Sequence, residues 1–81
     1  MKYKILPYLP DEKSGYLTTV QKAMVNYLIE NNTLNIGDAC QSKRHYCEII
    51  DKQDNIITIM FTSDFNSNLH RSKFKQKIEL L

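Results

Sequence analysis

The chain has 81 residues, of which 42% are hydrophobic and 25% are charged, and this composition is typical of one folded domain rather than a disordered chain. The formal net charge of +2 excludes a strongly acidic DNA mimic and does not by itself demand a nucleic-acid partner. No apolar run approaches the roughly 18 residues that span a bilayer and the start lacks the apolar core of a signal peptide, so we expect a cytoplasmic protein without membrane contact, whose Cys40 and Cys47 are free thiols.

Residues 1–16 are expected to form an N-terminal arm. Within it, the alternation over residues 2–6 predicts a short strand. Pro7 and Pro10 then interrupt regular pairing, because proline has no N–H to donate. The rest of the arm is expected to be a loop, and residues 17–81 are expected to hold the main domain.

The clearest helix signal begins at Thr18. Thr18 and Gln21 have the spacing of a capping box, in which each side chain bonds the other residue's backbone N–H. Apolar residues then recur on one helical face: Val20, Met24, Tyr27 and Leu28. Asn31-Asn32 predicts the end of this helix, because Asn tolerates the left-handed conformation of a C-cap.

Two further helices are predicted from capping residues. Asn35 suits the N-cap of a short helix over residues 35–41, and Ser42 suits that of a third helix over residues 42–52. The apolar members of the third helix are Tyr46, Ile49 and Ile50. Asp54-Asn55 then predicts a turn.

Two strands are expected in the last third of the chain. Residues 56–62 are rich in β-branched side chains and apolar on both faces, so this strand should be covered on both sides or lie at an interface. A polar loop over residues 63–72 leads to the last strand, residues 73–80. Its lysines occupy alternate positions, so one face presents a row of ammonium groups, which suits a polyanion.

From Thr19 to Leu80, the order helix, short helix, helix, strand, long loop, strand resembles small winged-helix domains common in phage genomes. The residues that carry the resemblance are Gln21, Tyr27-Leu28, Leu34-Asn35-Ile36, Asp38-Ala39, Arg44, Ile49-Ile50, Asn55-Ile56-Ile57-Thr58 and Lys77-Ile78-Glu79-Leu80. The resemblance implies an α+β winged helix, with three helices followed by a two-stranded β-hairpin wing and a short N-terminal strand. It also implies a phage or mobile-element transcriptional regulator that binds double-stranded DNA.

In a winged helix the third helix lies in the major groove and the wing meets the neighbouring DNA backbone. The resemblance therefore assigns DNA contact to the helix residues Gln41, Ser42, Lys43, Arg44 and His45, and to the wing residues His70, Arg71, Lys73, Lys75 and Lys77. Homodimerisation is expected to favour binding, because two half-sites multiply affinity. Plainer interpretations stay open, since exposed cations are often simply solvated and lysines also protect edge strands from aggregation.

The second hypothesis is a small phage-type accessory protein that binds and inhibits a host or defence protein. Aromatic residues such as Tyr8 and Phe65 are suitable interface anchors. A third hypothesis is self-assembly, with residues 56–62 pairing across a dimer.

Enzymatic and metal-binding interpretations have little support in the sequence. The chain has no paired-carboxylate motif, phosphate-binding glycine loop or serine elbow, so we predict that it is not an enzyme and has no cofactor. The candidate zinc ligands are Cys40, His45, Cys47 and His70. Their irregular spacing argues against a structural zinc site, and we predict no metal.

Overall fold

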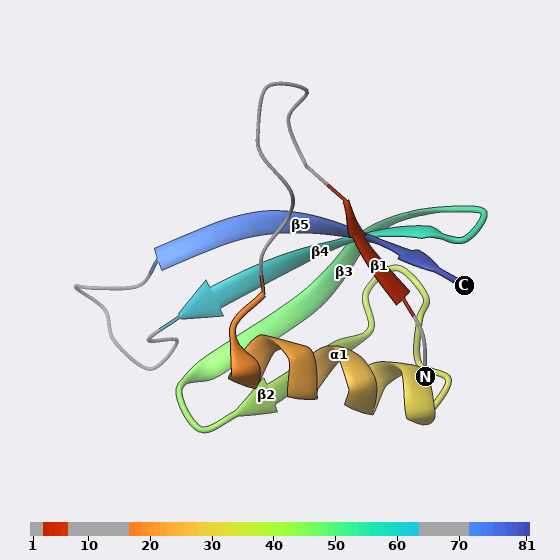
Figure 1. Ribbon diagram of the computed structural model, residues 1–81. Helices are drawn as coiled ribbons and strands as arrows, with labels where there is room; N and C mark the ends of the chain where they lie inside the picture. Colours follow the sequence, from red (N-terminus) through yellow and green to blue (C-terminus); the bar gives the residue numbers. More distant parts are fainter. Residues whose placement is uncertain (1–2, 7–16, 64–71) are drawn as a thin grey trace.

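A computed structural model describes residues 3–6, 17–63 and 72–81 of the chain. In these residues it has one helix and five strands: β1 (Tyr3–Leu6), α1 (Thr19–Glu30), β2 (Ala39–Ser42), β3 (His45–Gln53), β4 (Ile56–Ser63) and β5 (Ser72–Leu80) (Figure 1). All five strands belong to one sheet in the order β1-β5-β4-β3-β2, and every neighbouring pair is antiparallel. Strands β1 and β2 are therefore the two edges of the sheet.

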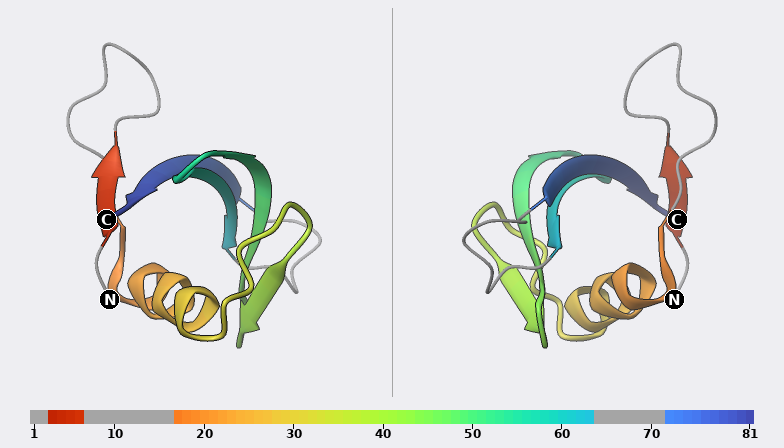
Figure 2. Two further views of the ribbon diagram at one scale, coloured as in Figure 1. Left: turned by 90° about the vertical axis from the view of Figure 1, so that its right-hand side faces the viewer. Right: turned by 90° about the vertical axis from the view of Figure 1, so that its left-hand side faces the viewer.

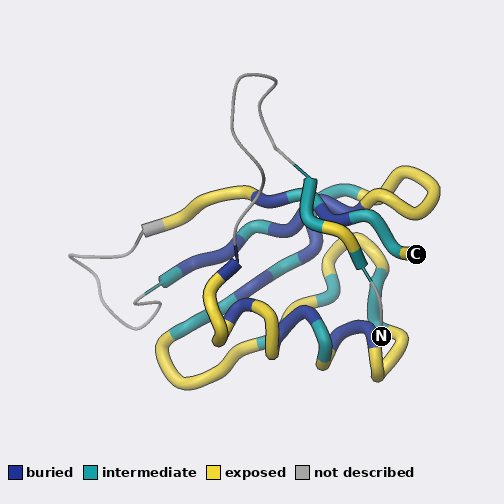
Figure 3. The backbone as a smooth tube through the Cα atoms, in the orientation of Figure 1, coloured by how far each residue is buried: buried dark blue, intermediate teal, exposed yellow. Residues whose placement is uncertain are grey.

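The sheet is strongly curved around the helix. Figure 2 shows the strands arching over α1, with β1 on one side, β2 on the other and the helix across the open side between them. The hydrophobic core fills the space between the concave face of the sheet and α1, and the buried stretches of both elements face each other there (Figure 3). The fold thus has two layers, a half-barrel of strands and one helix.

Cross-strand pairs of apolar residues build the concave side of the core. Ile49 pairs with Ile59, and Ile57 pairs with Ile78. From the helix side, the buried apolar residues are Met24, Val25, Leu28 and Ile29, preceded by the buried Leu17. The helical positions recur at steps of one and three residues, as expected for a helix that buries one face.

The predicted start of the helix and its capping box are confirmed. The Gln21 N–H donates to Thr18 Oγ1 at 3.2 Å, and the Thr18 N–H donates to Gln21 Oε1 at 2.9 Å. Gln21 is buried, and its side-chain oxygen is satisfied by this hydrogen bond. The short N-terminal strand and the Asp54-Asn55 turn are confirmed as well.

Thr18→Ala removes one bond of the capping box and should lower the free energy of unfolding by about 1 kcal/mol. Urea denaturation followed by far-ultraviolet circular dichroism measures the change. The matched control is Thr19→Ala, which makes the same substitution at the exposed first residue of α1. Equal losses in the two variants would show that the cap has no special part in stability.

The predicted winged helix is wrong. Residues 35–41 form a turn and most of β2, and residues 42–52 form the end of β2, a turn and most of β3. A helix cannot run through this region, because Gly37 has φ +96° and Lys43 has φ +55°. The predicted strands at residues 56–62 and 73–80 exist, but they are interior strands of a five-stranded sheet instead of a separate wing.

Gly37 shows how the chain enters β2. Its N–H donates to the Ile49 carbonyl at 2.9 Å, while the Ile49 N–H donates to the carbonyl of Asp38, also at 2.9 Å. Two residues thus oppose one, with glycine in the left-handed conformation, which is the arrangement of a G1 β-bulge. The bulge fixes which backbone groups of β2 face β3 and which face away.

Candidate functional site

The free edge of β2 exposes backbone hydrogen-bonding groups. In an antiparallel ladder, alternate residues bond the neighbouring strand. The Asp38 carbonyl accepts the Ile49 N–H of β3 at the bulge. Counting every second residue from Asp38, the backbone groups of Cys40 and Ser42 also bond β3, where they are opposite Cys47 and His45. The N–H and C=O groups of Ala39 and Gln41 therefore point away from β3, toward the edge at which the described sheet ends.

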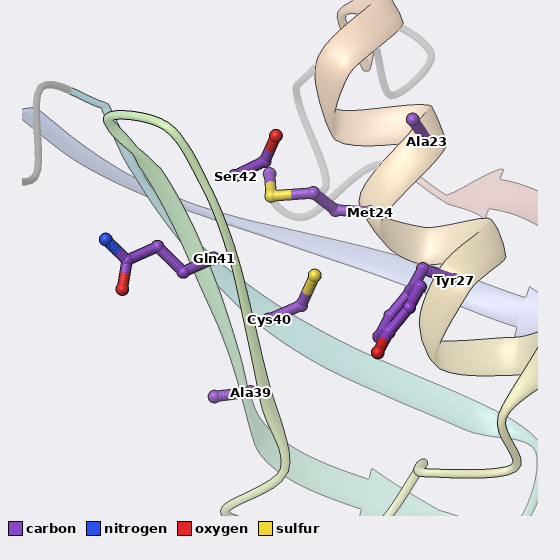
Figure 4. A pocket seen from close by; sticks show the side chains of 7 residues that line it. All are labelled: Ala23, Met24, Tyr27, Ala39, Cys40, Gln41 and Ser42. Carbon is purple, nitrogen blue, oxygen red and sulfur yellow. The ribbon is translucent and has the colours of Figure 1, made fainter.

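A hollow of about 480 Å³ lies between this edge and α1 (Figure 4). All four residues of β2 line it, together with Ala23, Met24 and Tyr27 of the helix. Figure 4 shows Cys40 pointing toward the helix, whereas Ala39 and Gln41 point away from it. Since side chains from both faces of β2 line the hollow, the hollow runs along the strand edge itself.

The helix side of this hollow is largely apolar and accessible. Tyr27 is 57% exposed, although it lies on the helix close to buried residues. Met24 is buried and forms the floor near Cys40 and Ser42. An aromatic ring and a thioether beside an open strand edge form the kind of surface on which another chain's side chains can pack.

A second hollow, of about 640 Å³, begins where β2 ends. It is lined by Val20 of the helix and by Ser42, Lys43, Arg44 and His45 of the β2–β3 hairpin. Ser42 lines both hollows, so the two lie next to each other at the end of β2. Lys43 and Arg44 are the two loop residues of the hairpin closed by the Ser42–His45 pair, and this tight turn projects both exposed cations at the end of the strand.

The thiols next to the first hollow are uncharged at neutral pH. Burial raises the pKa of the Cys40 thiol. Burial, followed by the charge of Cys40, raises the pKa of the Cys47 thiol to about 12. A thiol with a raised pKa is a poor nucleophile and metal ligand, because the thiolate is the reactive form. Cys40 therefore contributes a small apolar wall to the hollow.

The structure describes eight of the ten sequence-predicted DNA-contact residues, and these eight lie in two places. Gln41, Ser42, Lys43, Arg44 and His45 occupy the end of β2, the turn and the start of β3. The residues Lys73, Lys75 and Lys77 lie on β5. His70 and Arg71 lie outside the described residues. No recognition helix exists over residues 42–52, so the predicted insertion of this segment into a DNA groove as a helix is wrong.

The lysines of β5 share the convex face of the sheet with acidic side chains. Lys75 is opposite Met60, which is opposite Glu48, and Lys77 is opposite Thr58, which is opposite Asp51. Neighbouring strands are about 5 Å apart, and each of these lysines is two strands away from the acidic residue in its row. The backbone positions of the lysine and the acidic residue are therefore roughly 10 Å apart. The convex face therefore alternates in charge from β5 to β3, which weakens its attraction for a polyanion.

One end of the sheet is more uniformly basic. Lys73 is opposite Thr62, which is opposite Tyr46, so Lys73 lies near the same end of the sheet as the turn with Lys43 and Arg44. Thr62, between Lys73 and Tyr46 in this row, is itself almost fully buried. The sequence indicates both basic segments, and the structure places them at one end, two strands apart.

Sequence patterns do not reveal the strand edge and its hollow. In β3, the buried residues Cys47 and Ile49 alternate with the less buried residues Tyr46 and Glu48. The corresponding alternation of residue types is the sequence signal for this strand. The two cysteines are placed symmetrically about the Lys43-Arg44 turn, as the partners of a two-residue hairpin must be. Recognition of that hairpin would place β2 beside β3, but its position at the sheet edge depends on the whole strand order.

Comparisons with known proteins give no match. No family model matches the chain, and neither the curated proteins nor the solved structures compared with it provide one. In the part of the chain that the structure describes, α1 is too short and too polar to cross a membrane. Among the same residues, no three His, Cys, Asp or Glu side chains gather closely enough to hold a metal ion.

Proposed function

We propose that this chain is a protein-binding module that adds an extended segment of a partner protein to the free edge of β2. The observation that carries the proposal is the position of this edge beside a hollow lined by α1. In strand addition, backbone hydrogen bonds supply affinity and pockets for alternate side chains supply specificity. The outward-facing backbone N–H and C=O groups of Ala39 and Gln41 can form such hydrogen bonds, and the first hollow can hold a side chain of the added segment.

The two edges of the sheet differ in a way that favours β2. Lys4, on β1, is exposed, and the Leu6 carbonyl accepts a hydrogen bond from Gln76 Nε2 of β5. A lysine on an edge strand discourages pairing with another chain. Strand β2 carries no charged side chain between Ala39 and Ser42, so its edge lacks this protection.

The first hollow is bounded on one side by β2 and on the other by Ala23, Met24 and Tyr27 of α1. A second copy of this chain is a poor occupant, because its own β2 is flanked by β3, and β3 would have to enter the space that α1 fills. An isolated extended segment does not meet this obstacle. A segment of a partner is therefore the occupant proposed here, and the sequence-based hypothesis of an inhibitor of a host or defence protein stays a prediction about that partner.

Nucleic-acid binding is the second candidate. The observation that favours it is the presence of Lys43, Arg44 and Lys73 at one end of the sheet. Glu48 and Asp51 on the convex face oppose it, because they repel phosphate near the lysines of β5. The peptide proposal has the stronger geometric support. Its test must therefore distinguish peptide binding from DNA binding.

The test measures amide hydrogen exchange in the full chain with and without a peptide selected from a displayed library of random peptides. We expect exchange at Ala39 and Gln41 to slow at least about tenfold, because their N–H groups gain partners when a strand is added. Cys40 and Ser42 are internal controls, since their N–H groups already bond β3 and should change little.

Duplex DNA titrated by fluorescence anisotropy at low and moderate salt provides the competing readout. Binding that weakens steeply with salt, together with unchanged exchange at Ala39 and Gln41 in the peptide experiment, would replace the peptide proposal with nucleic-acid binding. Failure of every selected peptide to protect these two amides would by itself overturn strand addition at β2.

A further inference from the structure

We propose that the partner segment carries an aspartate or glutamate side chain over the β2–β3 turn and an apolar side chain beside Tyr27. This inference rests on the proposed strand addition at β2 and names the chemistry of the segment that binds there. Its basis is the difference in lining between the two hollows that meet at Ser42.

The length of β2 sets the spacing of the two features. A strand advances about 3.3 Å per residue, so Ala39 to Ser42 spans roughly 10 Å. An extended segment of equal length therefore reaches from the apolar hollow to the turn with only a few residues. Because side chains alternate along a strand, residues two apart in the segment can both face the helix side.

The basic end of the groove is defined by its lining. Lys43 and Arg44 both line the second hollow, and none of the five described residues around it is acidic. Val20 of α1 forms an apolar wall there and is partly exposed. A carboxylate next to such a wall is less hydrated than in open water, so its attraction to the cations is stronger than at a flat surface.

The opposite end of β2 has the opposite character. Asp38 precedes the strand, and its carboxylate accepts the Asn35 N–H at 2.8 Å. Ile36 is 63% exposed close by. A segment with a carboxylate at this end would meet the like charge of Asp38, whereas an apolar residue would meet Tyr27 in the first hollow. The edge therefore favours one placement of the segment, with its acidic residue over the turn.

The experiment compares peptides selected from the random library by the native chain and by Lys43→Glu. Lys43→Glu keeps a residue of similar backbone preference at the left-handed position, and circular dichroism verifies that it folds. We expect the native chain to select peptides with an acidic residue two to four positions from an apolar one. For such a peptide, Lys43→Glu should weaken binding by about five- to tenfold, in line with the loss of an exposed ion pair and its replacement by repulsion.

The matched control is Lys52→Glu. It makes the same change of charge at an exposed residue near the other end of β3, away from both hollows, and should change the affinity by less than about twofold. Equal weakening by the two variants, or selected peptides without an acidic preference, would overturn the inference. Protection of Ala39 and Gln41 would still stand in that case, so failure of the charge inference is distinguishable from failure of strand addition.

Discussion

Phe61→Ala is expected to lower the free energy of unfolding by about 3 to 5 kcal/mol. Phe61 lies on the central strand β4, is 1% exposed and is among the largest fully buried side chains. Its ring stacks with that of Phe74 across the β4–β5 pair, with ring centroids 5.6 Å apart. Removal of the ring leaves a cavity in the middle of the core and also deprives Phe74 of its partner.

Chemical denaturation at neutral pH measures this loss of stability. The loss should be a large fraction of the total free energy of unfolding of a domain of this size. Tyr27→Ala provides the control, because it also truncates an aromatic residue but at an exposed position. That variant should lose less than about 1 kcal/mol. A loss below about 1 kcal/mol for Phe61→Ala would contradict the packing described for the concave face.

The protein is expected to lose stability steadily as the pH rises from about 9 toward 12. Burial raises the pKa of the Cys47 thiol from the ordinary value of 9.0 to about 12. In this range the unfolded chain releases the thiol proton while the folded chain retains it, so the unfolded state binds fewer protons and the free energy of unfolding falls with pH. Below the ordinary value both states hold the proton and this contribution is constant.

Thermal unfolding monitored from neutral to strongly alkaline pH reveals this slope, and Cys47→Ala tests its origin. The partly buried Tyr3 and Cys40 contribute in the same direction, because burial raises the pKa of each, so the variant should flatten the slope without abolishing it. An alkaline slope that is unchanged in Cys47→Ala would show that other groups control the response.

Local signals in the sequence predict α1 correctly, but they wrongly predict a second helix over residues 35–41. Asn35 and Asp38 indicate the first turn of a helix, and the bond expected of such a turn exists between the Asn35 N–H and the Asp38 carboxylate. The turn does not continue as a helix, because Gly37 adopts a positive φ and the next residues pair with β3. A capping signal specifies one turn of chain, and tertiary pairing determines the conformation beyond it.

The prediction of a helix over residues 42–52 is wrong for a related reason. Tyr46, Ile49 and Ile50 have helical spacing, but the register between β3 and β4 skips Ile50 in a bulge between the Ile49 and Asp51 pairs. The extra residue interrupts the period-two pattern that would otherwise indicate a strand. By contrast, β4 and β5 pair in continuous register, and the sequence predicts both close to their observed bounds.

The candidate binding edge depends on information that no local pattern holds. The prediction that the alternating lysines of β5 share one face is confirmed, since it depends on strand geometry alone. The identity of the edge strands depends on the order of all five strands, including pairing between the two ends of the chain. The location of the groove is therefore beyond the reach of local sequence patterns.

The pairing of β1 with β5 has a consequence for the order of events during synthesis. Tyr3 is opposite Leu80, so β1 can join the sheet only after β5 has left the ribosome. Closing so long a loop is slow compared with formation of the β2–β3 and β3–β4 hairpins. A nascent chain that stops short of β5 would consequently hold β1 unpaired and available to chaperones and proteases until β5 is made.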